Sequence, residues 1–254
     1  MAKLSKQQSN LHLQSMDLVN SDKELTTDEK QFVLNNYNPN ATNLTTISGA
    51  FFTPESIAQQ FAIFSDPKGN IIELCAGIGS LSYWLLEYDQ FSGRRPSGWM
   101  SAEIENLTCV EINPEYVTVG KKIIPGANWI LGSVLNESLI KQIQFGDCVI
   151  ANPPFGAIRS DEDRTWIRYN MKAYFDLNVV AIGTQIANAG CFILPKGRTS
   201  YDMDKHEHIT NELHDNFKKA TGFMLELGSW DLKEFQNDWI GAKPIVEFVT
   251  FEKI

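Results

Sequence analysis

Short apolar segments alternate with amphipathic helical patterns along most of the chain, and this order limits the possible folds more than any other feature of the sequence. Seven segments are expected to be strands: residues 70–74, 107–112, 128–131, 147–151, 191–194, 223–227 and 244–251. Helical patterns lie before and between them, at residues 55–64, 81–86, 115–122, 170–189 and 209–220. Strands that alternate with helices form a parallel sheet with helices on both faces. The sequence therefore predicts a doubly wound α/β fold with a seven-stranded, mostly parallel sheet.

The last apolar segment has a different pattern from the rest. Residues 244–251 alternate between apolar and polar side chains. Such alternation is typical of an antiparallel strand that turns one face away from the core. We therefore expect an antiparallel strand near the C-terminus, at or close to an edge of the sheet.

The N-terminal part of the chain carries weaker signals. Residues 1–22 are polar with no clear periodicity, and we expect them to form a loose arm. Residues 27–37 have the apolar spacing of a short helix, which Thr27 is placed to cap. At the start of the next helix, Pro54 follows Thr53, a second expected cap. The expected division is an arm with a short helix over residues 1–48 and one catalytic domain over residues 49–254.

Composition and cysteine usage indicate the class of protein. The 254 residues include 43% hydrophobic and 21% charged residues, which are ordinary values for a soluble globular domain. No apolar run approaches the ~20 residues of a membrane span, and the N-terminus has no secretory signal. The cysteines lie in or beside apolar segments and form no CxxC pair, which is typical of reduced thiols in a cytoplasmic protein; they are Cys75, Cys109, Cys148 and Cys191. The histidines match no zinc pattern, so no metal is expected.

The formal net charge of the chain is −9. Proteins that coat nucleic acid bind its phosphates with an excess of Lys and Arg, so this charge counts against such a role. An enzyme with one local basic surface remains compatible with it. In that case we expect weak intrinsic affinity for nucleic acid, or a partner subunit that supplies the affinity.

A glycine-rich turn follows the first strand. The strand carries Glu73 near its end and leads into Cys75-Ala76-Gly77-Ile78-Gly79. The spacing is neither the GxGxxG of a dinucleotide site nor that of a P-loop. The turn suits the amino-acid end of S-adenosylmethionine, with Glu73 facing the ammonium and backbone amides facing the carboxylate. A plain strand–turn–helix connection is the alternative.

The second strand ends at Glu111 and Ile112, where an acid can hold a ribose diol.

The sharpest motif is Asn152-Pro153-Pro154-Phe155, directly after the fourth apolar segment. Proline lacks a backbone donor and stiffens the chain, which leaves backbone carbonyls free to accept hydrogen bonds. With the side-chain oxygen of Asn152, they can accept both N–H groups of an amine attached to an aromatic ring. Phe155 can stack on a base that has left the helix. The motif therefore predicts methylation of an aromatic amino group.

Taken together, these motifs resemble the class I methyltransferases that modify amino nitrogens of bases. Phe52-Thr53-Pro54 is similar to their N-terminal cofactor motif, and residues 73–79 to their glycine-rich motif. Many of these enzymes carry an Asp where Ser133 stands, before Val134, to meet the adenine of the cofactor. The order of motifs is similar to the gamma group of adenine DNA methyltransferases. The resemblance covers residues 49–195 and implies a Rossmann-like methyltransferase sheet, S-adenosylmethionine as cofactor and N6-adenine in DNA as target.

In one respect we expect the chain to depart from the gamma group, namely in having no separate target-recognition domain after the catalytic part. The expected nucleic-acid contacts are cations and one aromatic residue around the carboxyl edge of the sheet: Arg159, Arg164, Trp166, Arg168, Lys196 and Arg198. Acidic residues 161–163 dilute this group.

Three alternatives to DNA methylation stay open at the level of the sequence. One is N6-adenine methylation of ribosomal or transfer RNA, since RNA enzymes carry the same tetrapeptide. A second is methylation of a protein glutamine, although those enzymes usually have Tyr at the position of Phe155. The third is a degenerate binding subunit without activity.

Overall fold

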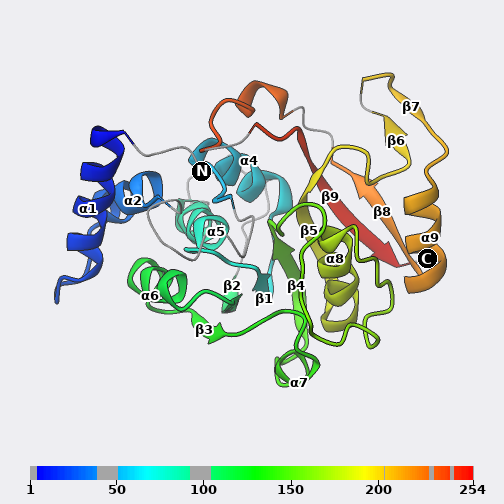
Figure 1. Cartoon of the computed structure of the whole chain (residues 1–254), viewed down its shortest axis with the longest axis horizontal. Helices are drawn as coiled ribbons and strands as arrows, with labels where there is room; N and C mark the ends of the chain where they lie inside the picture. Colours follow the sequence, from blue (N-terminus) through cyan, green and yellow to red (C-terminus); the bar gives the residue numbers. More distant parts are fainter. Residues whose placement is uncertain are drawn as a thin grey trace.

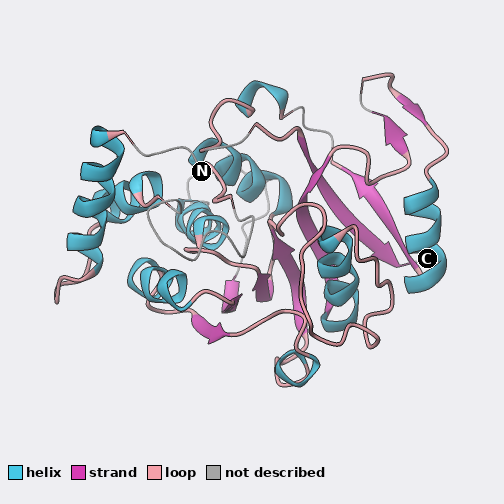
Figure 2. Ribbon diagram, viewed as in Figure 1, coloured by secondary structure: helices cyan, strands magenta, loops and turns pink. Residues whose placement is uncertain are grey.

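The computed structural model describes residues 5–38, 51–91, 104–202, 204–228, 232–240 and 243–253. Seven strands of the described chain form one sheet in the order β3-β2-β1-β4-β5-β9-β8 (Figures 1 and 2). Strand β9 runs antiparallel to both of its neighbours, β5 and β8, and all the other pairs of this sheet are parallel. The strands are β1 (Gly69–Leu74), β2 (Ile104–Glu111), β3 (Asn128–Leu131), β4 (Gly146–Ala151), β5 (Ala187–Pro195), β8 (Phe223–Leu227) and β9 (Val246–Lys253). The predicted fold class is confirmed, with β9 second from the edge.

Helices cover both faces of the sheet (Figure 1). Successive strand residues point to opposite faces. Ile71 and Ile150 pack on the face that meets α4, α5 and α6, while Ile72 and Val149 pack on the face that meets α7, α8 and α9. The bounds are α4 (Glu55–Ser65), α5 (Ser80–Phe91), α6 (Pro114–Ile123), α7 (Glu137–Ile140), α8 (Phe175–Ile186) and α9 (Glu212–Thr221). Burial on both faces explains why the buried parts of the parallel strands are mostly apolar.

The N-terminal residues are more ordered than predicted. In place of a loose arm, the chain forms α1 (Lys6–Val19), followed by α2 (Thr27–Asn36). Ser5 starts α1 with a capping box, in which its hydroxyl accepts from the Gln8 N–H and the Gln8 side chain accepts from the Ser5 N–H. Thr26, not Thr27, caps α2 in the same way with Glu29. The predicted domain boundary between residues 48 and 49 lies outside the described residues.

The long helix predicted over residues 170–189 is wrong at both ends. Helix α8 starts at Phe175, and residues 187–189 already belong to β5. Pairing of Ala187 and Ala189 with β4 supplies backbone hydrogen bonds that override the helix propensity of an alanine-rich stretch. Helix α9 starts at Glu212 rather than residue 209 because Asn211 caps it.

Small elements between the main strands were not predicted. They are the hairpin of β6 (Tyr201–Asp202) and β7 (Glu207–His208), α7, and a short 3-10 helix η3 (Lys233–Phe235). No helix of the described ranges is long and apolar enough to cross a membrane.

Candidate active site

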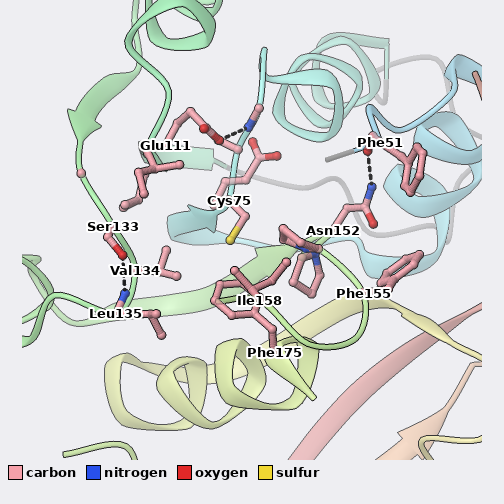
Figure 3. Close-up of a pocket in the computed structure, with 18 of the residues that line it drawn as sticks. Phe51, Cys75, Glu111, Ser133, Val134, Leu135, Asn152, Phe155, Ile158 and Phe175 are labelled. Atoms are coloured by element: carbon pink, nitrogen blue, oxygen red, sulfur yellow. Dashed lines mark hydrogen bonds between the residues drawn. The ribbon is translucent and has the colours of Figure 1, made fainter. Parts of the chain in front are cut away.

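The sheet topology brings the glycine-rich turn and the tetrapeptide together. The chain leaves β1 toward β2 on one side, and β4 lies on the other side of β1. Leu74 pairs with Ala151 in the register, so the residues that follow β1 and β4 emerge side by side. Ligands of open α/β sheets bind at such a switch point. A cavity of about 240 Å³ lies here, lined by the carboxyl ends of β1, β2, β3 and β4 (Figure 3).

The turn after β1 needs a backbone that most residues avoid. Cys75, Gly77 and Gly79 have φ angles of +57°, +57° and +87°. A Cβ atom at Gly77 would lie 3.2 Å from the Phe52 ring, so the ring packs directly on the turn. Burial raises the pKa of the Cys75 thiol, which disfavours a reactive thiolate. The turn is therefore tight, and the Cys75 thiol that lines the cavity beside it is not a reactive thiolate.

Glu111 joins the ends of β1 and β2. Its Oε2 accepts from the Gly77 N–H at 2.8 Å, and its Oε1 accepts from the Asn113 N–H at 2.8 Å. Burial raises the pKa of this carboxyl group, and the backbone donors Asn113 and Gly77 oppose the rise. Figure 3 shows the carboxylate bonded to the turn beside the cavity. Glu111 thus holds the turn in place, and each of its oxygens has a further lone pair beyond these two bonds.

Glu73 is more deeply buried than a solvated strand-end acid. Only 2% of the residue is exposed, and its Oε2 accepts from the Ser82 hydroxyl. Burial raises the pKa of Glu73 to about 8. The group is therefore mostly protonated at neutral pH in the absence of a cationic ligand.

Asn152 is oriented by the segment that precedes α4. Its Nδ2 donates to the Thr53 hydroxyl at 2.9 Å and to the Phe51 carbonyl at 3.3 Å (Figure 3). A carbonyl can only accept, so the nitrogen must be the atom that faces Phe51. The amide oxygen is left to accept a hydrogen bond from another group. Thr53 is not the helix cap that the sequence predicts, because Pro54 occupies that position without a side-chain cap.

The loop of residues 156–174, which follows the tetrapeptide, is fastened to the end of β3. The Ser133 hydroxyl donates to Glu162 Oε2 at 2.6 Å, and Trp166 Nε1 donates to the Leu135 carbonyl at 3.0 Å. Ser133 and Glu162 both line the cavity. The loop therefore closes the cavity on the side of β3.

Most of the predicted cofactor residues line this one cavity. They are Phe52, Thr53, Glu73, Cys75, Ala76, Gly77, Glu111, Ile112, Ser133, Val134 and Asn152, joined by Pro153, Pro154 and Phe155 of the tetrapeptide. Pro54 and Gly79 are not in its lining. A Cβ atom at Gly79 would approach Ile124 and Trp129, so this glycine serves helix packing instead.

The predicted nucleic-acid contacts are not gathered in the same way. Of the six, only Arg159 lines the cavity, and Arg168 is exposed elsewhere on the loop. Arg164 is buried and donates to the Ile158 carbonyl at 2.9 Å. Lys196 pairs with Asp204, and Arg198 pairs with the buried Asp176 at 2.7 Å while its guanidinium lies over the Tyr174 ring. Their predicted role in substrate binding stays a prediction.

Several cavity residues were missed by sequence reasoning: Phe51, Leu135, Ile158, Ser160, Glu162 and Phe175. Phe51 adjoins the predicted Phe52 motif and could have been included on that ground. Glu162 was counted only as an acid that dilutes the basic loop, because no local pattern places it against Ser133. Among the described residues, no group of three or more His, Cys, Asp or Glu side chains is arranged to hold a metal ion.

Solved structures share this fold at low sequence identity. A Pyrococcus horikoshii protein assigned as an RNA methyltransferase has a TM-score of 0.52 and 18% identity, over 84% of this chain and 92% of that one. A Listeria monocytogenes protein assigned to the class I S-adenosylmethionine-dependent methyltransferases has a TM-score of 0.55 and 14% identity, over 98% and 81% of the two chains. The M protein of the type I restriction enzyme EcoKI has a TM-score of 0.55 and 12% identity. This match covers 98% of the present chain and 55% of the EcoKI protein.

These similarities establish a Rossmann-like sheet of the kind found in methyltransferases. No family model and no curated protein sequence matches the chain. The chain spans about half the length of the EcoKI M protein.

Proposed function

We propose that this chain transfers a methyl group from S-adenosylmethionine to the N6 amino group of adenine in DNA. The observation that carries the proposal is the orientation of Asn152. Thr53 and the Phe51 carbonyl hold its amide nitrogen, so its oxygen is free to accept a hydrogen bond beside the glycine-rich turn. An acceptor at this place, next to a stiff double-proline turn, suits an amine donor.

The charges around the cavity favour a cationic cofactor. The ionisable lining residues are Cys75, Glu73, Glu111, Glu162 and Arg159, so carboxyl groups outnumber cations. The glycine-rich turn before α5 could also face a phosphate, but the carboxyl groups around the cavity disfavour the polyanionic nucleoside triphosphates and dinucleotides. S-adenosylmethionine instead carries a sulfonium and an ammonium group, which carboxylates attract. Glu111 would hold the ribose hydroxyls, and Glu73 would meet the ammonium. The names of the structural neighbours are consistent with this cofactor.

When bound, S-adenosylmethionine supplies an electrophilic methyl group on its sulfonium. The protein's task is to activate a weak nucleophile, since the lone pair of adenine N6 is delocalised into the ring. Asn152 Oδ1 and a backbone carbonyl of the tetrapeptide would accept the two N–H bonds of N6. Both contacts favour a pyramidal nitrogen whose lone pair points at the methyl carbon.

The transfer needs no strong general base. When the amine held by Asn152 attacks, the new nitrogen–carbon bond would replace the carbon–sulfur bond, and the electron pair of the broken bond would stay on sulfur. The methylated amine is then cationic and strongly acidic, so water removes its proton. Phe155 and the exposed Phe51 would stack on the flipped adenine at the cavity mouth.

DNA is proposed over RNA because the Thr-Pro motif precedes the glycine-rich motif, and because the EcoKI M protein superposes on 98% of this chain. The net charge of −9 disfavours the phosphate backbone, and Lys196 and Arg198 already pair with carboxylates of the protein. We therefore propose that a partner subunit supplies sequence specificity and part of the DNA affinity. RNA-methylating neighbours make RNA the first alternative to test.

The test is to incubate the protein with methyl-labelled S-adenosylmethionine and separate panels of DNA, RNA and protein. Each product is digested to nucleosides or amino acids, and the labelled species is identified by mass spectrometry. N6-methyladenine from DNA is the expected result. Label confined to RNA, or to glutamine in protein, would replace the proposed substrate. Cofactor binding without transfer to any panel would indicate a binding subunit.

A further inference from the structure

The hydroxyl group of Ser133, just after β3, already donates its hydrogen bond to a protein acceptor. Ser133 Oγ donates to Glu162 Oε2 at 2.6 Å and accepts from the Leu135 N–H at 3.1 Å. This hydroxyl is therefore a weak acceptor for any amino group in the cavity. The strong acceptor at this place is the carboxylate of Glu162, which reaches β3 from the loop that follows the tetrapeptide.

Within the described part of the chain, every hydrogen bond to the Glu162 carboxylate goes to the same oxygen. Oε2 accepts from Ser133 and also from the Ser160 hydroxyl at 3.2 Å. The other oxygen, Oε1, receives no donor from the described residues, although Glu162 lines the cavity. A half-buried carboxylate held by two hydroxyls and left with one open oxygen is suited to accept from a ligand.

The surroundings of Glu162 suit a flat heterocycle. Ile112, Val134, Leu135 and Ile158 line the same cavity. Ile112 is 53% exposed, which is unusual for an apolar side chain beside a pocket and is explained if a ring covers it. The cavity thus offers apolar faces for a purine and one acceptor for its amino group.

We propose that Glu162 recognises the exocyclic amino group of the cofactor's adenine, in place of an acid at position 133. This inference rests on the proposed function, because it assumes that S-adenosylmethionine occupies the cavity. A carboxylate accepts hydrogen bonds and cannot donate, so it favours adenine over hypoxanthine, which carries an oxygen at the same position. Because Glu162 belongs to the 156–174 loop, cofactor binding would also fix the loop that leads away from the tetrapeptide.

The test compares the binding of S-adenosylhomocysteine and S-inosylhomocysteine by titration calorimetry. We expect the wild-type chain to prefer the adenine compound by at least about 30-fold, the effect of one hydrogen bond to a charged group together with the repulsion of an oxygen. In Glu162→Gln the amide can donate to the hypoxanthine oxygen, so the preference should fall to about 3-fold or less. Asp161→Asn makes the same change of charge on the neighbouring exposed residue and should keep the full preference.

Two further variants distinguish the loss of the Glu162 carboxylate from a general disturbance of the 156–174 loop. Ser133→Asp combined with Glu162→Gln returns a carboxylate to the same place and should restore the preference for adenine. Glu162→Ala should weaken binding of the adenine compound by about 10-fold or more without a comparable loss for the inosine compound. If the wild type binds neither compound, the proposed function itself fails. If the wild type prefers adenine and both Glu162 variants keep that preference, only the role of Glu162 is overturned.

Discussion

At the carboxyl ends of β1 and β2, the polar groups of the cavity are buried and bonded to their neighbours, whereas the polar groups of the 156–174 loop are mostly exposed. Glu73 and Glu111 are 2% and 6% exposed; Glu73 accepts from the Ser82 hydroxyl in α5, and Glu111 accepts from the Gly77 N–H in the turn after β1. Arg159 and Arg168 are exposed on the loop. The side that would hold the cofactor is thus fixed by the sheet, while the side that would meet DNA depends on one long loop.

This difference indicates which functions are built into the chain. Backbone amides and buried acids at strand ends keep their positions without a ligand, so cofactor binding needs little rearrangement. The exposed cations supply weak, salt-sensitive attraction. If the proposed function holds, a chain built in this way would bind the cofactor by itself and depend on a partner for the choice of DNA sequence.

The largest effect is expected from Asn152→Ala, which acts where the two sides meet. It removes the acceptor for adenine N6, so turnover should fall by at least about 100-fold. Cofactor affinity should change by about 3-fold or less, because the turn and Glu111 are untouched. Turnover is measured with labelled S-adenosylmethionine, and affinity by calorimetry.

Two matched variants sharpen this result. Asn170→Ala truncates an exposed asparagine of the 156–174 loop and should keep wild-type rates. Thr53→Val removes only the hydroxyl that accepts from Asn152 Nδ2, and we expect an intermediate fall in turnover of about 5-fold to 10-fold. Wild-type turnover in Asn152→Ala would refute the mechanism.

A smaller effect, confined to the cofactor side, is expected from Glu111→Gln. The new amide can accept from only one of the two N–H groups, so either Gly77 or Asn113 loses its acceptor. We expect affinity for S-adenosylhomocysteine to fall by about 10-fold to 100-fold. Glu115→Gln, on an exposed position of α6, is the control and should bind normally. Unchanged affinity in Glu111→Gln would show that the ribose lies elsewhere.

The sequence could predict the cofactor side of the cavity, at the ends of the strands, but not the contacts of the 156–174 loop. The cofactor side follows from short local patterns at the ends of two strands, a glycine turn after one and an acid at the end of the other, which the parallel sheet places side by side. The parallel register then makes Leu74 and Ala151 neighbours without further information. The contact between Ser133 and Glu162 joins residues 29 positions apart through an irregular loop. No periodicity predicts such a contact, and the ion pair of Arg198 with Asp176 was missed for the same reason.

A pH effect of moderate size is expected from Glu73. Burial raises the pKa of Glu73 to about 8 from an ordinary value of 4.5. Between these two values the folded chain keeps a proton that the unfolded chain has lost, so the free energy of unfolding falls as pH rises through this window. Glu73→Gln should remove this part of the slope in denaturant titrations. Parallel pH profiles for the two proteins would contradict the burial of an ionisable group.

The smallest effects on DNA binding are expected from single Lys and Arg variants. They compare Arg159, which lines the cavity, with Lys196 and Arg198, which already form ion pairs. Arg159→Ala should raise the KM for DNA by about 3-fold and lower the salt dependence of binding by about one ion. Lys196→Ala should leave the salt dependence unchanged, because its ammonium group already contacts Asp204 and lies 4.0 Å from Asp202. Arg198→Ala should instead destabilise the fold by about 3 kcal/mol, since it leaves Asp176 buried without its cation. KM is measured at several salt concentrations and stability by urea unfolding. An equal loss of salt dependence in all three variants would mean that the ion pairs open when DNA binds, and that the substrate surface extends across both Lys196 and Arg198.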